Sequence, residues 1–184
     1  FVVGALEKSS IKDLSLIKEA DLLVGIPSSG LHTNGYSLVR HALRIDENPS
    51  ILKESFEEIN GALGDTLLIP HRSYYNTIAP LFSVFKAAAH ITGGGLPENI
   101  PRVLPEGLSA RIDTTTWDRP PIISLIQKMG NINQSEMYRV FNMGLGMVLV
   151  CEPSAAYEAI KEIPGASVIG EVVRTRKDER VSLV

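Results

Sequence analysis

The polar residues that could do chemistry gather in three glycine-rich loops. The first, Ser28–Gly35, reads SSGLHTNG and joins an apolar run to a helical pattern. A helix N-terminus leaves backbone N–H groups free and carries a partial positive charge, so this loop suits a phosphate group. Capping of the helix explains Thr33 or Asn34 without a ligand, but it does not explain His32 or the paired serines. Ligand binding and simple capping therefore both remain open for this loop.

The second loop, His90–Arg102, reads HITGGGLPENIPR. Three successive glycines cost conformational entropy, which a close approach of the backbone to a ligand would justify. The alternative is a tight turn before a helix interrupted by prolines, for which one glycine would suffice. We expect Asn99 to cap that short helix, with Pro101 in its first turn. The side chains available to a ligand here are those of Thr92, Glu98, Asn99 and Arg102.

The third loop, Phe141–Met147, reads FNMGLGM and contains a Gly-x-Gly pattern. A strand pattern follows it, whereas the dinucleotide-binding fingerprint requires a helix there, so we exclude a Rossmann site. The glycines fit a bulge or tight turn entering the strand, and Asn142 is available to line a cleft.

Other candidates carry weaker indications. Arg72, which follows His71, could reach a phosphate, although such a side chain is more often solvated. His41 and His90 have no partner at ligand spacing, and Cys151 is the single cysteine, so the sequence predicts no metal site. The chain contains neither a P-loop nor a nucleophile-elbow motif.

The composition of the whole chain narrows the function further. Its 184 residues, 44% of them hydrophobic, suit one domain with a sizeable core. The net charge is −3 and no block of Lys and Arg occurs, which argues against nucleic acid as a partner. Apolar runs are too short for a membrane span, so we expect no membrane. A single cysteine fits a reducing compartment, and we expect the cytoplasm.

Strands and helices alternate along the chain and must position these loops. The pattern predicts an α+β or α/β domain with a mixed β-sheet flanked by helices. Leu38, Val39, Ala42 and Leu43 form one face of a helix after the first loop. We expect strands at 1–7, 21–26, 87–91, 110–114, 145–151, 167–174 and 181–184, and helices at 121–129, 134–141 and 153–163, with two short helices in 51–69 and a helix at 73–85 that Pro80 kinks or splits.

Together the three loops resemble the aminoimidazole ribonucleotide synthetase family. The family's motifs fall on Ser28–Gly35, on Thr92–Gly95, on Glu98–Arg102 and on Phe141–Gly146. Two departures are visible: Met143 stands where the family often has Cys, and a usual Pro-Thr-Arg reads Pro70-His71-Arg72. The resemblance covers essentially the whole chain but only the C-terminal half of the family's polypeptide. It implies that residues 1–20 are the last strand of a missing N-terminal domain plus a linker, and that residues 21–184 are the C-terminal synthetase-type domain.

The resemblance implies an ATP-dependent ligase of purine biosynthesis. Its substrates would be formylglycinamidine ribonucleotide and ATP, and its product aminoimidazole ribonucleotide. Mg-ATP would be bound mainly by the absent N-terminal domain, and the full-length enzyme would be a homodimer. His32 and Asn34 are the implied catalytic residues, with His32 either an acid–base or a hydrogen-bond donor. The implied substrate- or phosphate-binding residues are Ser28, Ser29, Gly30, Thr92, Gly93, Gly94, Gly95, Glu98, Asn99, Arg102 and Asn142.

Two alternatives from other classes stay open. The chain could be a structural, self-associating domain without activity, or part of a sister ATP-dependent enzyme of the same superfamily, although the stretch ENIPRVLP favours the aminoimidazole ribonucleotide synthetase over its sisters. The full-length protein could also be multifunctional, with other enzymes fused to this one. We expect the isolated chain to fold and to be inactive.

Overall fold

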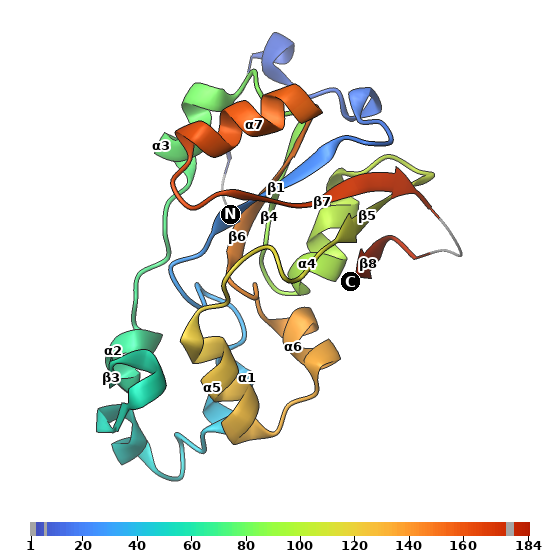
Figure 1. Cartoon of the computed structure of the whole chain (residues 1–184). Coiled ribbons are helices and arrows are strands. Elements are labelled where there is room, and N and C mark those ends of the chain that lie inside the picture. Colours follow the sequence, from blue (N-terminus) through green and yellow to red (C-terminus); the bar gives the residue numbers. More distant parts are fainter. Residues whose placement is uncertain (1–2, 6, 176–178) are drawn as a thin grey trace.

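The computed structural model describes residues 3–5, 7–175 and 179–184 of the chain. Within them a six-stranded sheet has the order β4-β6-β1-β7-β5-β8, and helices pack on both faces of its central strands (Figure 1). The strands are β1 Leu22–Pro27, β4 Ala87–His90, β5 Leu108–Ile112, β6 Leu145–Cys151, β7 Ser167–Arg174 and β8 Val181–Leu183, and a separate hairpin pairs β2 Ser55–Phe56 with β3 Gly61–Ala62.

Seven α-helices occur among the described residues. They are α1 Tyr36–Ala42, α2 Leu63–Leu67, α3 Tyr75–Ile78, α4 Gly95–Asn99, α5 Pro121–Gly130, α6 Gln134–Val140 and α7 Pro153–Glu162. Neighbouring strands of the large sheet pair antiparallel, except that β5 and β8 are parallel. The predicted α+β fold with a mixed sheet and flanking helices is therefore confirmed.

The side chains of the central strands point alternately to the two faces of the sheet, and this divides the core into two layers. On β1, Leu23 packs into the larger cluster with residues of α1, α4, α5 and α6, whereas Val24 and Ile26 belong to a second cluster with α7. Successive side chains of a strand point to opposite faces, so both faces of this strand are buried and its sequence is apolar throughout. Gly25 keeps the first face open, because a Cβ there would lie 2.7 Å from Ile169 Cγ2.

Most predicted elements are confirmed within a few residues. The expected helix at 73–85 is split near Pro80, into α3 and the 3-10 turn Ala79–Leu81. The prediction of two short helices in 51–69 is only half right. Asn60 adopts a left-handed conformation and reverses the chain, so β2 and β3 pair before α2 begins.

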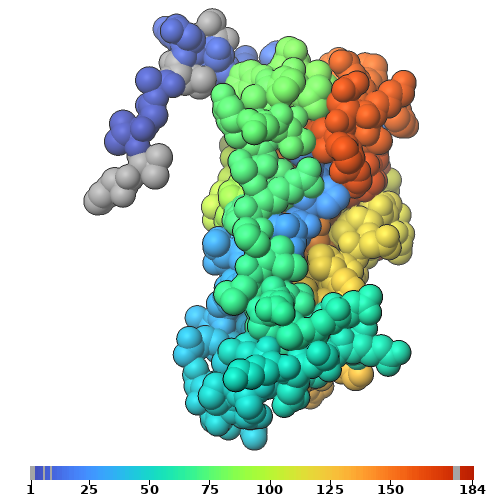
Figure 2. Space-filling view, turned by 90° about the vertical axis from the view of Figure 1, so that its left-hand side faces the viewer, coloured from blue at the N-terminus to red at the C-terminus, as the bar shows by residue number. Residues whose placement is uncertain are grey.

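The predicted strand at 1–7 is not found where the structure describes this segment. Residues 3–5 and 7 have no regular structure, and Val3 is 94% exposed. Residues 1, 2 and 6 lie outside the described part of the chain. Figure 2 shows the described residues near the N-terminus, in blue, standing away from the body of the molecule.

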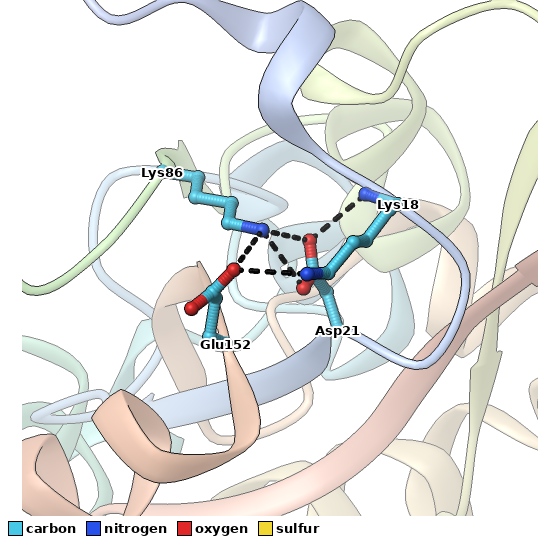
Figure 3. A network of polar contacts seen from close by, with 4 residues as sticks. All are labelled: Lys18, Asp21, Lys86 and Glu152. Carbon is cyan, nitrogen blue, oxygen red and sulfur yellow. Dashed lines mark hydrogen bonds and ion pairs between the residues drawn. The ribbon is translucent and has the colours of Figure 1, made fainter.

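An ion-pair network, buried at Asp21 and exposed at Lys18 and Glu152, lies at one end of the sheet (Figure 3). Asp21 is fully buried immediately before β1, and Lys86 Nζ lies 2.9 and 3.0 Å from its two carboxylate oxygens. Lys86 also lies 3.2 Å from Glu152, which in turn pairs with Lys18 at 3.1 Å. Asp21 and Lys86 precede β1 and β4, and Glu152 follows β6. The network therefore lies at the end of these strands opposite to the three loops. It joins the segment that precedes β1 to the neighbouring strands of the sheet.

Candidate functional site

The three glycine-rich loops converge because they leave neighbouring strands at one end of the sheet. β6 lies between β4 and β1 and runs antiparallel to both, so its beginning meets the ends of the other two. Pro27 at the end of β1 pairs with Leu145, and His90 at the end of β4 pairs with Met147. The backbone joins the loops directly, since Ser28 N–H donates to the Gly144 carbonyl at 2.8 Å. Segments more than a hundred residues apart in sequence thus form one surface.

Asn142 holds the first loop to the third. Its side chain is fully buried, its Nδ2 donates to the Gly30 carbonyl at 2.8 Å, and its Oδ1 accepts the Gly144 N–H at 2.9 Å. Ser28 Oγ also contacts the Gly30 carbonyl at 2.9 Å and Asn142 Oδ1 at 3.3 Å. These groups are occupied within the protein, so Asn142 positions the first loop through its contacts.

Asn99 has the same task in the second loop. Its Nδ2 lies within hydrogen-bond distance of the carbonyls of Thr92, Gly93 and Gly95, at 3.3, 3.2 and 2.8 Å. Thr92 Oγ1 donates to its Oδ1 at 3.1 Å. The prediction that Asn99 caps a helix is wrong in its chemistry. A 3-10 turn does begin after it, at Ile100, but the side chain makes no capping bond because it faces back into the glycine loop.

Two of the three successive glycines are required by packing. Gly95 has φ +57, and a Cβ there would lie 1.8 Å from the Tyr138 carbonyl oxygen. Gly94 has φ +93, and a Cβ would meet the Glu98 side chain at 2.5 Å. At Gly93 the nearest atom to such a Cβ is Asn34 Oδ1 at 3.8 Å, an ordinary contact. Packing therefore leaves Gly93 unexplained, and its exposed backbone faces Asn34.

The alternative that Thr33 or Asn34 caps α1 is wrong. The N-cap residue is Gly35, in a left-handed conformation with φ 81. A Cβ at Gly35 would lie 2.3 Å from Phe141, so a side chain cannot stand at this position. Thr33 and Asn34 consequently belong to the loop itself, and capping no longer accounts for them.

His32 and Asn34 each present a buried side-chain nitrogen that has no partner among the residues that the structure describes. His32 is 3% exposed with φ 58, a conformation uncommon for residues other than glycine. Its Nε2 accepts the Ser29 N–H at 3.1 Å, while its Nδ1 is buried without a partner, as is Asn34 Nδ2. Burial, with smaller contributions from His71, His90 and the Arg72 charge, lowers the pKa of His32 to about 4. Unsatisfied buried polar groups are costly and rare, so these two atoms, which lie in one loop, are candidate ligand contacts.

A fourth segment, residues 70–74 between α2 and α3, joins the loop end; the sequence had indicated only Arg72 in it, as a weaker candidate for phosphate. Ser29 Oγ donates to the Pro70 carbonyl at 2.8 Å and accepts the Arg72 N–H at 3.1 Å. Tyr74 Oη donates to the Pro27 carbonyl at 2.8 Å, and burial raises the pKa of Tyr74 to about 12. The departure from the family's Pro-Thr-Arg motif also falls in this segment.

Gly146 makes room for this fourth segment. A Cβ there would lie 1.9 Å from Tyr74 Oη and 2.6 Å from His32 Cε1. The His71 ring stacks on that of His32 with centroids 3.9 Å apart, and His90 lies 5.3 Å from His71. His90 has no histidine at ligand spacing in the sequence, but the fold brings His71 and His32 from other parts of the chain close to it.

The charged residues predicted to contact a ligand lie further out. Glu98 and Arg102 are both exposed, on α4 and on the 3-10 turn after it. A pocket of about 270 Å³ borders the first loop at Ser29 and Gly30 and extends to α5 at Pro121. Larger hollows lie over the open face of β5 and β7, so size alone does not select the loop end.

Among the residues that the structure describes, no helix has the length and apolar character needed to cross a bilayer. Residues 18–182 match the protein family described as AIR synthase related protein, C-terminal domain.

Curated relatives with similar sequences are named phosphoribosylformylglycinamidine cyclo-ligase. The one from Bifidobacterium longum (strain DJO10A) is 49% identical over 164 residues, which are 88% of this chain and 47% of the relative. The one from Thermoanaerobacter pseudethanolicus is 43% identical over 180 residues, 95% of this chain and 53% of the relative. The chain spans about half the length of the curated relatives that it matches.

Solved structures share the fold at low identity. Thiamine monophosphate kinase from Aquifex aeolicus has a TM-score of 0.57 at 15% identity, over 91% of this chain and 51% of that one. The hydrogenase maturation protein HypE has a TM-score of 0.57 at 13% identity, over 94% and 51%. A structure described as AaThiL complexed with AMPPCP and TMP has a TM-score of 0.54 at 16% identity, over 90% and 47%.

Proposed function

This chain belongs to the AIR synthase related proteins, as their C-terminal domain, and we propose that it acts as the C-terminal half of a phosphoribosylformylglycinamidine cyclo-ligase. Identities of 43–49% to proteins of that name support the assignment. Residues 1–20 would then connect it to a preceding domain. The complete protein would be a cytoplasmic homodimer of purine biosynthesis.

The reaction joins ATP hydrolysis to a ring closure. The formyl oxygen of formylglycinamidine ribonucleotide accepts the γ-phosphoryl group of ATP. An amidine nitrogen then attacks the formyl carbon, and the phosphorylated oxygen leaves as phosphate. Aminoimidazole ribonucleotide, ADP and phosphate result. An amide oxygen leaves poorly and phosphate leaves well, so the remaining demands on the protein are positioning and charge stabilisation.

The observation that carries the proposal is the pair of unpartnered donors, His32 Nδ1 and Asn34 Nδ2. Both belong to the first loop, and Gly93 of the second loop faces Asn34. We assign to these donors the oxygen atoms of the substrate or of the transferred phosphoryl group. Donors that are fixed before the ligand arrives need no reorganisation during the reaction, which is why such pairs accelerate group transfer.

The hydrogen bonds favour a donor role for His32 over general acid–base catalysis. Since Nε2 accepts the Ser29 N–H, the ring proton of the neutral imidazole belongs on Nδ1. The lowered pKa of His32 keeps its ring neutral at pH 7. The Nδ1 proton therefore forms a hydrogen bond to the ligand and stays on the ring.

The remaining predicted residues divide into two groups. Ser28, Ser29, Asn99 and Asn142 hold the loops in place through the contacts described above. We assign phosphate or ribose contacts to Gly30, Thr92, Gly93, Gly94, Glu98 and Arg102. Gly95 is buried, with its N–H donating to the Thr92 carbonyl at 3.0 Å and its carbonyl accepting from Asn99, so it shapes the loop. Glu98 is the one carboxylate in the three loops, whereas Mg²⁺ needs several oxygen ligands, so these loops do not fit a magnesium site. We therefore assign Mg-ATP mainly to residues outside this chain.

Kinetics of the complete protein test the proposal. His32→Ala and Asn34→Ala should each lower kcat by about 10²–10³-fold, the usual effect of removing one fixed donor. His41→Ala is the matched control, because His41 is exposed on α1. A kcat unchanged in both loop variants at saturating substrate would overturn the assignment of these donors. A pH profile of kcat without an inflection attributable to His32 supports the donor role.

A further inference from the structure

Three of the four histidines of the chain meet beside the first loop. His32 comes from that loop, His71 from the segment between α2 and α3, and His90 from the end of β4. One ring nitrogen of each can be chosen so that all three lie within 4.8 Å of one another. We propose that His32, His71 and His90 bind one divalent transition-metal ion, with Zn²⁺ as the preferred ion.

The donor set selects the class of metal. Imidazole nitrogen suits Zn²⁺, Cu²⁺, Ni²⁺ and Co²⁺, whereas Mg²⁺ and Ca²⁺ require oxygen ligands. Three protein ligands with a fourth position left to water form a common zinc arrangement. His71 and His90 reach solvent, so the ion has an entry path and an open fourth position. This site does not involve the Mg-ATP of the proposed reaction, but it shares His32 with the proposed substrate contact, so the metal ion and the substrate would compete for this ring.

The buried ligand is His32. A neutral imidazole has one lone pair, which the Ser29 N–H uses at 3.1 Å, while Nδ1 has no partner. Metal binding either displaces that N–H from Nε2 or moves the ring proton from Nδ1 to Nε2. In both cases the environment of the Ser29 amide changes, which provides a local readout.

Two features oppose binding and set how far the site must adjust. Ligand nitrogens around tetrahedral Zn²⁺ lie about 3.3 Å apart, given Zn–N bonds of about 2.0 Å, so the cluster must contract. The stacked ring of His71 must turn, and its exposure permits this. The Arg72 guanidinium, which contacts the Tyr74 ring, adds a positive charge nearby. We therefore expect weaker binding than at a dedicated structural zinc site.

The test is a titration of the tag-free 184-residue chain with Zn²⁺ alone, and separately with Co²⁺ alone, in buffer free of phosphate and thiols. We expect saturation at one ion per chain, visible absorption bands from bound Co²⁺, and a shift of the Ser29 amide resonance on addition of Zn²⁺. His71→Thr and His90→Ala should each weaken binding by more than about 100-fold, because even groups that only orient ligands contribute 10–100-fold.

His41→Ala is the matched control and should bind as the parent chain does, since its side chain is exposed on α1. His71 and His90 are accessible, so their variants should fold, which circular dichroism checks. The proposal is overturned by the absence of saturable binding at one ion per chain, by unchanged affinity in His71→Thr, or by loss of binding in His41→Ala. The test does not depend on the proposed reaction, because no catalytic readout enters it.

Discussion

Replacing Asn142 with alanine should destabilise the chain substantially, although Asn142 resembles a ligand-binding residue in sequence. In the structure its side chain is fully buried and bridges the first and third loops. The substitution removes both ends of this bridge at once.

The magnitude follows from the groups left behind. The Gly144 N–H loses the Asn142 Oδ1 acceptor at 2.9 Å, and an unsatisfied buried donor costs about 1–3 kcal/mol. The Gly30 carbonyl keeps Ser28 Oγ as a donor at 2.9 Å, so its lost bond adds only about 1 kcal/mol. The sum is about 2–4 kcal/mol. For a domain of this size that lowers Tm by roughly 4–16 °C.

Thermal and urea unfolding of the purified chain measure this directly. The matched control is Asn133→Ala, since Asn133 is exposed and its side chain makes no capping hydrogen bond with α6. That variant should stay within about 0.5 kcal/mol of the parent. If Asn142→Ala unfolds at the temperature of the control, the positioning role of Asn142 is refuted.

Three further outcomes are expected. Asp21→Ala should lose about 3 kcal/mol in urea unfolding, because it leaves the largely buried Lys86 ammonium with only the half-exposed Glu152 as its partner, and an unchanged midpoint would contradict this. Gly95→Ala should lower the free energy of unfolding by more than about 4 kcal/mol or abolish folding. Gly61→Ala should be neutral, because a Cβ there meets open space. Equal stability of the two variants would contradict the packing argument. Burial raises the pKa of the Cys151 thiol to about 12, so a thiol reagent at pH 8 should modify it only after denaturation, and rapid modification of the native chain would contradict its burial.

Hydrophobic periodicity and the positions of proline and glycine predicted most of the fold, because the helices and strands concerned depend on the residues within them. The apolar run at 145–151 and the helix at 121–129 are recovered as β6 and α5 almost residue for residue. Pro80 split its helix as a missing N–H requires. The hairpin of β2 and β3 was missed. Each of its strands has only two residues, which is too short for a periodic pattern, and the chain reversal depends on the left-handed conformation of Asn60.

The site was predictable in its loops and not in its contacts. Motif resemblance selected His32 and Asn34, but only the fold shows that their donors lack partners. Asn99 and Asn142 share the composition of ligand-binding residues, and only the hydrogen bonds reveal that they hold loops. The proximity of His71 to His32 depends on the path of the chain between α2 and α3, which no local pattern encodes.

Product analysis of the complete protein tests the central claim most directly. Incubated with formylglycinamidine ribonucleotide and Mg-ATP, it should form aminoimidazole ribonucleotide, ADP and phosphate in equal amounts, while the isolated 184-residue chain forms none. Ring closure by the isolated chain at the rate of the complete protein would contradict the division of labour between the two halves. ATP consumption by the complete protein without the imidazole product, or transfer of phosphate to a stable phosphorylated product, would contradict the cyclo-ligase assignment.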